Sequence, residues 1–342
     1  MSDVGINVFL ASGVLLFIAL LVLSSTRMRS NDPYGLFHLT LNKAPSQDPN
    51  LPPATEWLNM GYWKKHVEVG VNCFLGQRKE FIPLWLRSSR AKINRGWQTA
   101  HRGKSVRLLP STTTQPNQLV DSLPDVGHGT GESLLFLLSE PSLPRISHLV
   151  GITSLEVHHE RSVDRVHKLQ ALRDIDTIVD LYHADAICTD RANPAHPLST
   201  LSNETFDVIL ALDCAYHFNT RRLFLEQAYT KLERGGTVAL ADICFSSDAL
   251  KTRRTQFLVS VLRLMPRHNV ISKEDYVAQM KRIGYSDVVL EDITDDVFPS
   301  FSRFLKTQGW GWWVLGKVID WYASAGARFV IVSGKVDTVD AE

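Results

Sequence analysis

Three glycines at alternate positions follow an acidic residue near the middle of the chain. The segment Leu123-Pro-Asp-Val-Gly-His-Gly-Thr-Gly-Glu-Ser133 leads an apolar run to Asp125 and then to Gly127, Gly129 and Gly131. Glycine allows a backbone to approach a ligand closely, and it adopts positive φ without strain. A leucine-rich segment with helical character follows at once. A strand, a glycine turn and a helix in this order predict a nucleotide pocket at the carboxyl edge of an α/β sheet.

The elements that must position this turn are strands alternating with helices. The pattern from Val120 onward predicts seven strands interleaved with helices, which indicates one doubly wound α/β domain. The clearest helix runs from Leu223 to Leu232 and is ended by Arg234-Gly-Gly236. The predicted strands are Leu119–Val126, His148–Thr153, Asp180–Ala184, Phe206–Leu212, Gly236–Ile243, Asp287–Asp292 and Arg328–Lys335.

The composition excludes some classes of partner. The chain has 342 residues, 44% of them hydrophobic, and a formal net charge of +1. This near balance gives no reason to expect nucleic acid as a partner. The four cysteines have no metal-ligand spacing, which indicates free thiols in a reducing compartment and no metal site.

The first 29 residues are expected to form a membrane anchor. The segment from Gly5 to Thr26 carries no charged residue, and Arg27 and Arg29 follow it. A helix of this length spans about 33 Å, enough to cross a bilayer. The basic residues on its carboxyl side predict a single pass with the rest of the chain in the cytosol, and we favour the endoplasmic reticulum. The alternative is a buried core helix.

Two further regions lie before the glycine turn. Residues 30–55 are rich in Pro, Asn, Asp and Ser and are expected to be a linker, so the catalytic domain would cover 56–342. Residues 82–118 form a basic insertion, with seven Lys and Arg and no acid between Arg87 and Arg107. Such a segment suits contact with anionic lipid head groups, or it is a solvated insertion.

Several segments, taken together with the glycine turn, resemble one enzyme family in the correct order. They are Asn59-Met-Gly-Tyr-Trp63, Gly151-Ile-Thr153, His183-Ala-Asp-Ala186, Thr205-Phe-Asp207 and Ala211-Leu-Asp-Cys-Ala-Tyr-His-Phe218. The chain resembles the Rossmann-like (class I) S-adenosylmethionine (SAM)-dependent methyltransferases. It is similar to the small-molecule group that includes cyclopropane-fatty-acid, tocopherol and sugar O-methyltransferases. The resemblance covers roughly residues 57–336 and implies a mostly parallel seven-stranded sheet whose last strand is antiparallel.

The resemblance implies SAM as cofactor and a set of residues that bind it. Aromatic residues of the entry motif would lie over the cofactor, Asp185 would accept from the adenine amino group, and Asp213 would lie near the methionine end. Many relatives have an acid two residues after Gly151, whereas this chain has Thr153, so the ribose contact departs from the usual pattern. The implied cofactor residues are Tyr62, Trp63, Asp125, Gly127, Gly129, Gly131, Thr153, Ser154, His158, Asp185, Ala186 and Asp213.

The resemblance also implies a general base. In O-methyltransferases of this type the histidine that matches His217 has that role, and Asp242 matches an acid that supports it. A neutral histidine oriented by a carboxylate can accept a proton from a hydroxyl at neutral pH. We therefore expect His217 and Asp242 to be catalytic. The alternative for His217 is a buried histidine with satisfied hydrogen bonds.

A tryptophan-rich segment lies between the last two predicted strands. Residues 301–322 include Trp310, Trp312, Trp313 and Trp321. Since tryptophan favours membrane interfaces, this segment is expected to cap the site and touch the bilayer, or else to pack as a core helix against the sheet.

These features predict a membrane-anchored SAM-dependent methyltransferase that modifies a hydroxyl or amine of a small, lipophilic acceptor. The first alternative is a catalytically inactive, membrane-anchored scaffold with the same fold. The second is a protein methyltransferase, although no acceptor groove for a peptide is evident in the sequence.

Overall fold

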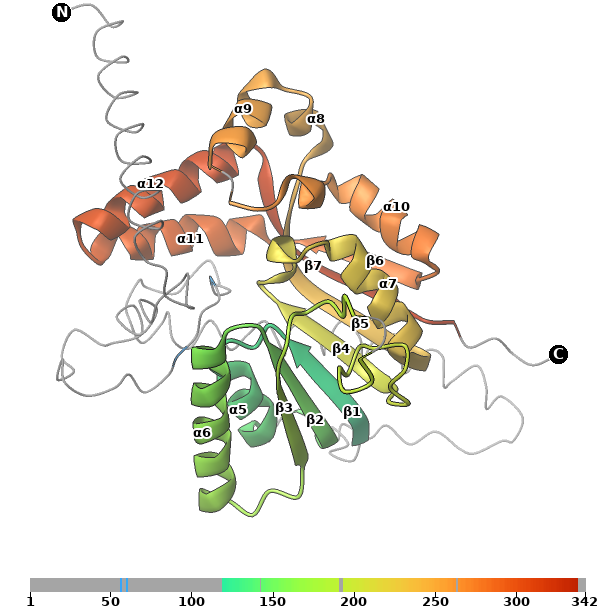
Figure 1. Cartoon of the computed structure of the whole chain (residues 1–342). Helices are drawn as coiled ribbons and strands as arrows, with labels where there is room; N and C mark the ends of the chain where they lie inside the picture. Colours follow the sequence, from blue (N-terminus) through green and yellow to red (C-terminus); the bar gives the residue numbers. More distant parts are fainter. Residues whose placement is uncertain are drawn as a thin grey trace, which may run out of the picture.

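A mixed seven-stranded sheet organises the chain (Figure 1). The computed structural model describes residues 56, 60, 119–141, 143–190, 193–262 and 264–337. The strand order is β3-β2-β1-β4-β5-β7-β6. The strands are β1 (Leu119–Val126), β2 (Arg145–Thr153), β3 (Ile178–His183), β4 (Phe206–Leu212), β5 (Leu232–Phe245), β6 (Ser286–Asp292) and β7 (Ala327–Lys335).

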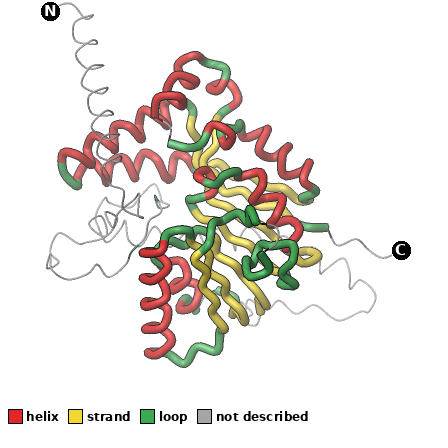
Figure 2. The backbone as a smooth tube through the Cα atoms, in the orientation of Figure 1, coloured by secondary structure: helices red, strands yellow, loops and turns green. Residues whose placement is uncertain are grey.

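Helices connect the strands and cover the sheet on both sides (Figure 2). Two short 3-10 helices, η1 (Ala215–His217) and η2 (Arg267–Asn269), lie beside the carboxyl end of β4 and before α10 respectively. The α-helices are α5 (Glu132–Ser139), α6 (Glu156–Leu172), α7 (Arg221–Lys231), α8 (Ser247–Leu250), α9 (Arg253–Leu262), α10 (Lys273–Ile283), α11 (Thr294–Thr307) and α12 (Trp310–Ser324).

The sheet has the topology that the sequence predicts. Strands β1 to β5 pair in parallel, and β7 pairs antiparallel with both β5 and β6. Strands β1 and β4 have the predicted bounds. Strand β5 is longer than expected, because the chain runs extended directly from the end of α7 and Leu232 already pairs with Phe206. A register shift between Phe206 and Val208 accommodates the extra residues.

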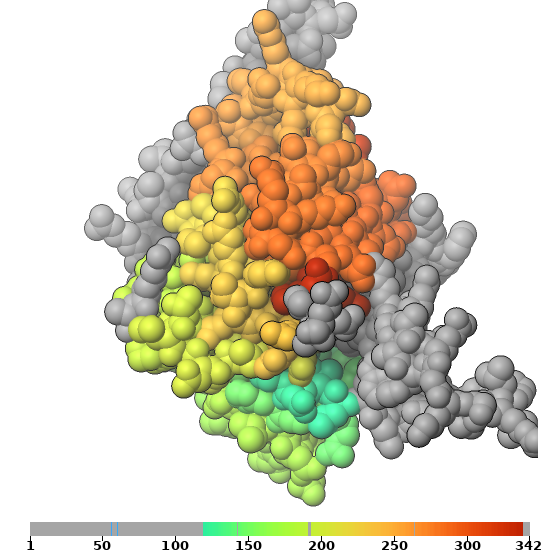
Figure 3. All heavy atoms as spheres, turned by 90° about the vertical axis from the view of Figure 1, so that its right-hand side faces the viewer, coloured from blue at the N-terminus to red at the C-terminus, as the bar shows by residue number. Residues whose placement is uncertain are grey.

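The sheet buries a separate hydrophobic cluster on each face. Residues of α5, α6, α11 and α12 pack on one face, and residues of α7 and α10 pack on the other. The space-filling view shows α7 and α10 side by side on the second face (Figure 3). Because both faces are covered, the central strands are apolar along their whole buried length, as in β4, where Ile209, Leu210 and Ala211 are at most 1% exposed.

The predicted anchor, linker and basic insertion lie outside the described residues. The predicted anchor covers residues 1–29, the linker covers residues 30–55, and the basic insertion covers residues 82–118. Among the helices that the structure describes, none combines the length and apolarity needed to span a bilayer.

The tryptophan-rich segment is a helical hairpin. Helices α11 and α12 meet at Gly309 and lie side by side (Figure 1). Helix α11 buries Phe298, Phe301 and Phe304 against the sheet, as the core-helix alternative anticipates. On α12, by contrast, Trp310 is 75% exposed and Trp313 is 45% exposed. The hairpin therefore has one face in the core and a solvent-facing face that carries tryptophan.

Candidate active site

A cavity of about 420 Å³ opens at the carboxyl ends of β1 to β4. Strand β1 lies between β2 and β4 in the sheet, and the strand order along the chain reverses there. The cavity therefore lies at the switch point, where open α/β sheets commonly bind ligands. The cavity is lined by Met60, Asp125, Gly127, His128, Gly129, Ser133, Ile152, Thr153, Ser154, Leu155, His158, Asp185, Ala186, Leu212, Asp213, Cys214, Tyr216, His217, Phe218 and Asn219.

The glycine turn forms the floor of this cavity with its backbone. Gly127 has a φ of 81°, and the backbone N–H of Gly127 donates to the carbonyl of Ile152 at 2.7 Å. A Cβ atom added at Gly127 would lie 2.6 Å from Sγ of Cys214. Any larger residue here would be strained and would collide with its neighbour. Gly129 also lines the cavity, whereas Gly131 lies at the N-cap of α5, outside the lining residues.

Asp125 presents an unused carboxylate oxygen to the cavity. The side chain is 1% exposed, and its Oδ2 accepts a hydrogen bond from the hydroxyl of Ser133. Its Oδ1 is buried and has no hydrogen-bond partner among the described residues. Burial raises the pKa of Asp125 to about 6, because the charged form is desolvated. A cationic ligand group at Oδ1 would satisfy this carboxylate.

The other predicted cofactor residues line the same cavity along β2 and β3. Thr153 ends β2 and is 5% exposed, and Ser154 follows it. His158 reaches the cavity from the first turn of α6. After β3, Asp185 accepts the N–H of Ile187 through Oδ1 at 3.0 Å and lies beside Ala186 at the rim. The structure thus brings together residues from four separate segments, while Tyr62 and Trp63 lie outside the described residues.

Asp213 holds two parts of the cavity wall together. Its Oδ2 accepts the backbone N–H of Met60 at 2.7 Å, and its Oδ1 accepts the hydroxyl of Tyr216 at 3.0 Å. Asp213 itself has a φ of 59°, a conformation that aspartate tolerates better than most residues. Asp213 lines the cavity, its predicted contact with the methionine end of the cofactor stays a prediction, and its carboxylate holds the backbone of Met60.

His217 faces the cavity from η1. Its ring lies against the ring of Tyr216, with the centroids 4.2 Å apart. His217 is exposed to solvent, but nearby protein atoms partly desolvate the imidazole, which disfavours its charged form and lowers the pKa of His217 to about 4. The side chain is therefore neutral near pH 7 and has an imidazole nitrogen able to accept a proton.

The predicted orientation of His217 by Asp242 is corrected by the structure. Asp242 is fully buried at the end of β5 and does not line the cavity. Its Oδ2 lies 2.6 Å from Nε of Arg221 and accepts the hydroxyl of Tyr276 at 2.8 Å, and its Oδ1 accepts the N–H of Ile243. Because a buried carboxylate pairs with the nearest available cation, Arg221 takes the place that the sequence motif assigned to His217.

The sequence did not identify several residues of the cavity. His128 is the most distinctive: it is 7% exposed, and neither ring nitrogen has a hydrogen-bond partner among the described residues. Burial lowers the pKa of His128 to about 3, so the ring is neutral. In the sequence, the only feature that could have indicated a cavity position for His128 is its place between Gly127 and Gly129. The remaining lining residues that were not predicted are Met60, Ser133, Ile152, Leu155, Leu212, Cys214, Tyr216, Phe218 and Asn219.

Comparison with known proteins gives two sequence relatives. No protein-family model matches the chain. The 27-O-demethylrifamycin SV methyltransferase of Amycolatopsis mediterranei is 26% identical over 215 residues, which cover 58% of this chain and 70% of that protein. The erythromycin 3''-O-methyltransferase of Saccharopolyspora erythraea is 27% identical over 184 residues, which cover 52% of this chain and 54% of that protein. The second match spans little more than half of the relative's length.

Solved structures share the fold. The geranyl diphosphate C-methyltransferase of Streptomyces coelicolor A3(2), determined with Mg²⁺, geranyl-S-thiolodiphosphate and S-adenosyl-L-homocysteine, aligns with a TM-score of 0.51 at 14% identity. The alignment covers 78% of each chain. At this identity the similarity establishes the fold of the chain.

Proposed function

We propose that this chain, a SAM-dependent methyltransferase of the small-molecule type, transfers a methyl group to a hydroxyl or amine of a small, lipophilic acceptor, with His217 as general base. The family resemblance, the enzyme class and the cofactor predicted from the sequence are confirmed. The nature of the acceptor, the base and the membrane anchor are parts of the proposal. The observation that carries it is the presence, in one cavity, of a glycine cradle, a carboxylate oxygen with no hydrogen-bond partner among the described residues and a neutral histidine.

The glycine turn and the strand ends would hold the cofactor. Bound SAM supplies an activated methyl group on a sulfonium. The turn at Gly127 and Gly129 leaves room for it, and Oδ1 of Asp125 accepts its ammonium group. Asp185 and Ala186 suit the adenine, whereas Thr153, Ser154 and His158 offer hydroxyl and imidazole groups to the ribose. These assignments follow the order of the segments around the cavity.

His217 would remove the proton that an alcohol or amine must lose. Its imidazole is neutral at pH 7, so a ring nitrogen accepts the proton as the acceptor attacks. The other contribution of the protein is positional, because the acceptor must be held in line with the methyl group and away from water. Met60 and Tyr216, both held by Asp213, form the wall next to His217.

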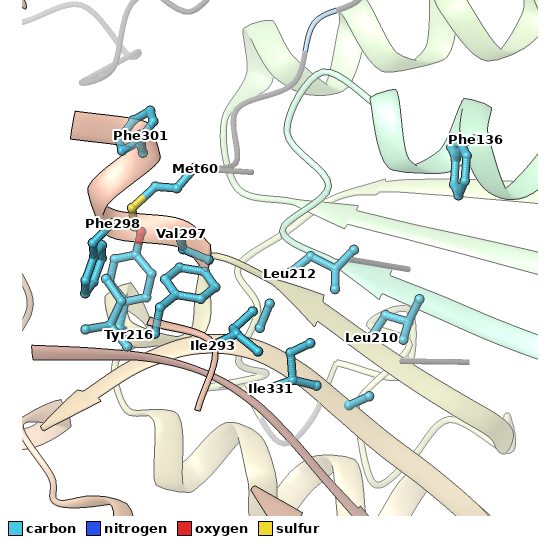
Figure 4. Packing of buried hydrophobic residues seen from close by; sticks show 14 of the residues in the cluster. Met60, Phe136, Leu210, Leu212, Tyr216, Ile293, Val297, Phe298, Phe301 and Ile331 are labelled. Atoms are coloured by element: carbon cyan, nitrogen blue, oxygen red, sulfur yellow. The ribbon is translucent and has the colours of Figure 1, made fainter. Parts of the chain in front are cut away.

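The apolar wall beside His217 supports a lipophilic acceptor. Met60, Leu212 and Tyr216 line the cavity and also belong to the hydrophobic cluster on the α11 face of the sheet. Figure 4 shows Met60 and Tyr216 packed next to Val297 and Phe298 of α11. Apolar acceptor groups that contact this wall leave water, which favours binding by about 25 cal/mol for each Å² buried.

A membrane location is also proposed. The apolar segment 5–26 supports a single-pass anchor with the catalytic domain in the cytosol, and we favour the endoplasmic reticulum. The exposed Trp310 and Trp313 on α12 suit the head-group region of a bilayer. An enzyme held there would meet lipophilic acceptors at high local concentration.

Cofactor binding is tested first by a matched pair of glycine substitutions. Gly127 and Gly309 both have positive φ, but a Cβ atom at Gly127 meets Cys214, whereas nothing lies within 4 Å of one at Gly309. Calorimetric titration of the full chain in detergent with SAM and S-adenosylhomocysteine should show micromolar binding that Gly127→Ala abolishes and Gly309→Ala retains. Absence of binding by the folded wild-type chain would instead favour the inactive scaffold.

Methyl transfer itself is then measured with SAM that carries a labelled methyl group. The chain is incubated with fractionated lipid extracts, and label in the organic phase identifies the acceptor fraction. Label found only in aqueous metabolites would overturn the lipophilic acceptor, and label in protein would favour the protein methyltransferase.

A further inference from the structure

We infer that Asn269, held by the buried pair of Arg221 and Asp242, is a positioning residue that sets the conformation of the His217 segment. The inference rests on the proposed role of His217 as base. Asp242 does not line the cavity, so it cannot orient the imidazole of His217 directly as the sequence predicted. The inference gives Asp242 an indirect role in positioning His217.

Asn269 binds the backbone on both sides of His217. Its Nδ2 donates to the carbonyl of Tyr216 at 3.0 Å and to the carbonyl of Phe218 at 2.7 Å. These are the residues immediately before and after His217 in the chain. Asn269 is 1% exposed, so neither carbonyl can exchange this donor for bulk water without opening the packing. One amide group therefore fixes the turn from which the imidazole projects.

Arg221 fixes Asn269 in turn. The backbone N–H of Arg221 donates to Oδ1 of Asn269 at 2.9 Å, and Nη1 donates to its backbone carbonyl at 2.8 Å. The carboxamide thus has its oxygen bound at the start of α7 and its nitrogen bound at η1. Because both ends are bound, the amide cannot rotate to another set of partners, and η2 is tied to the segment 216–221.

Asp242 and Tyr276 hold the guanidinium group of Arg221. Besides the contact with Asp242, the guanidinium donates through Nη2 to the carbonyl of Ile243 at 2.8 Å. It also lies over the ring of Tyr276, 4.7 Å from the centroid. Arg221 is 1% exposed, Asp242 and Tyr276 are fully buried, and the three come from α7, β5 and α10. A fully buried ion pair is a poor source of stability, so we assign this pair a role in fixing the position of Arg221.

The assembly is a connected path from β5 to the candidate base. The carboxylate of Asp242 holds Arg221, Arg221 holds Asn269, and Asn269 holds the carbonyls that flank His217. A second connection is the backbone N–H of Asp213, which donates to the carbonyl of Ala241 at 2.7 Å. Asp242 therefore acts on His217 through the backbone and not through the imidazole.

The test follows the titration of the His217 imidazole by NMR in the full chain with isotope-labelled histidine. The resonance among the 12 histidines is assigned from its loss in His217→Gln. In the wild type we expect a pKa below the ordinary value of about 6.5. His217 is already exposed to solvent, but in Asn269→Ala the released segment no longer holds the imidazole against the protein atoms that partly desolvate it, so the pKa should rise toward about 6.5.

Two further variants separate positioning from a general loss of packing. Thr255 is equally buried, and its hydroxyl donates to the carbonyl of Ala325 far from the cavity, so Thr255→Val should leave the His217 titration unchanged. Tyr276→Phe keeps the ring over Arg221 and removes only the hydroxyl that binds Asp242. It should shift the titration in the same direction as Asn269→Ala but less, and it serves as the test if Asn269→Ala does not fold.

An unchanged His217 titration in folded Asn269→Ala, or in Tyr276→Phe when the first variant does not fold, would overturn the positioning role. S-adenosylhomocysteine binding is measured on the same samples by calorimetry. We expect Asn269→Ala to change its Kd by less than about threefold, since no cofactor residue is removed. If the wild type binds no cofactor, the proposed function fails while the titration still tests the positioning of His217.

Discussion

At the scale of single residues, two buried aspartates show how environment sets the role of a side chain. Asp125 and Asp242 each lie at or near the end of a central strand, and both are at most 1% exposed. Asp242 is paired with Arg221 and is satisfied within the protein. Asp125 has one oxygen without a partner among the described residues, and it faces the cavity. Only Asp125 is therefore poised to bind a ligand cation.

Cofactor affinity should depend on the ionisation of Asp125. The pKa of this group is about 6, so it is anionic above pH 6 and loses its charge as the pH falls through that value. SAM binding should therefore weaken by up to about tenfold for each pH unit below 6, where the attraction for the ammonium group is lost. Calorimetric titration between about pH 5 and pH 8 measures this. Asp125→Asn should bind SAM weakly, and its affinity should depend less on pH. If the affinity of that variant depended on pH as steeply as that of the wild type, Asp125 would be excluded as the group that causes the pH dependence.

His217→Ala should lower methyl transfer by about 100-fold or more, because the acceptor loses its base. The Kd of S-adenosylhomocysteine should stay unchanged. In the wild type the rate should fall as the pH is lowered through about 4, since only the neutral imidazole accepts a proton. His148→Gln is the control, because His148 pairs with Asp180 at the surface away from the cavity. Equal rates in His217→Ala and the wild type would eliminate this base.

At the scale of elements, charged side chains connect residue 56 to the glycine turn. Glu56 is 4% exposed and accepts two hydrogen bonds from Arg161 of α6, each of 2.6 Å. The backbone N–H of Glu56 donates to Glu132, and Arg165 binds both Glu132 and the carbonyl of Thr130. This cluster joins Glu56 to α5 and α6.

Arg161→Ala should release Glu56, four residues before the cavity-lining Met60, and weaken SAM binding about tenfold, a loss of about 1.4 kcal/mol. Such a loss is within the contribution expected for hydrogen bonds between charged groups in a buried site. Lys168→Ala is the matched control on the same helix, since its pair with Asp164 is exposed to solvent. Calorimetry on both variants measures the effect, and similar Kd values for the two would show that the cluster does not shape the cavity.

At the scale of the whole molecule, the arrangement separates a cofactor region from a tryptophan-bearing hairpin. The cavity lies at the carboxyl ends of β1 to β4, whereas α11 and α12 follow β6 at the opposite end of the strand order. No residue of this hairpin is among those that the structure shows lining the cavity. The expectation that it caps the site is thus unsupported, while its contact with a bilayer stays a prediction.

The double variant Trp310→Gln/Trp313→Gln tests that contact. With the full chain in vesicles that contain brominated lipid, tryptophan fluorescence should be quenched strongly in the wild type and much less in the variant, because both side chains are exposed on α12. Leu172→Gln removes an apolar group of α6 that is 83% exposed and should leave the quenching unchanged. Equal quenching in the double variant and the wild type would place the hairpin away from the bilayer.

The sequence by itself determined the order of strands and helices along the chain, the glycine turn and half of the residues that line the cavity. Strands β1 and β4 end as predicted because hydrophobic runs and turn residues are local signals, and residues that end neighbouring parallel strands must meet at one edge of the sheet. The functional roles of those residues remain predictions.

Only the tertiary structure decided which charged and polar groups meet. Asp242 pairs with Arg221, Asn269 reaches the His217 segment, and Glu56 binds Arg161, although these partners are distant in the chain. No local pattern carries such information, because each pairing depends on how helices pack against the sheet and on which cation reaches a buried carboxylate. The sequence motif thus predicted an acidic residue, Asp242, near the end of β5. The packing of helices against the sheet determined that this residue pairs with Arg221.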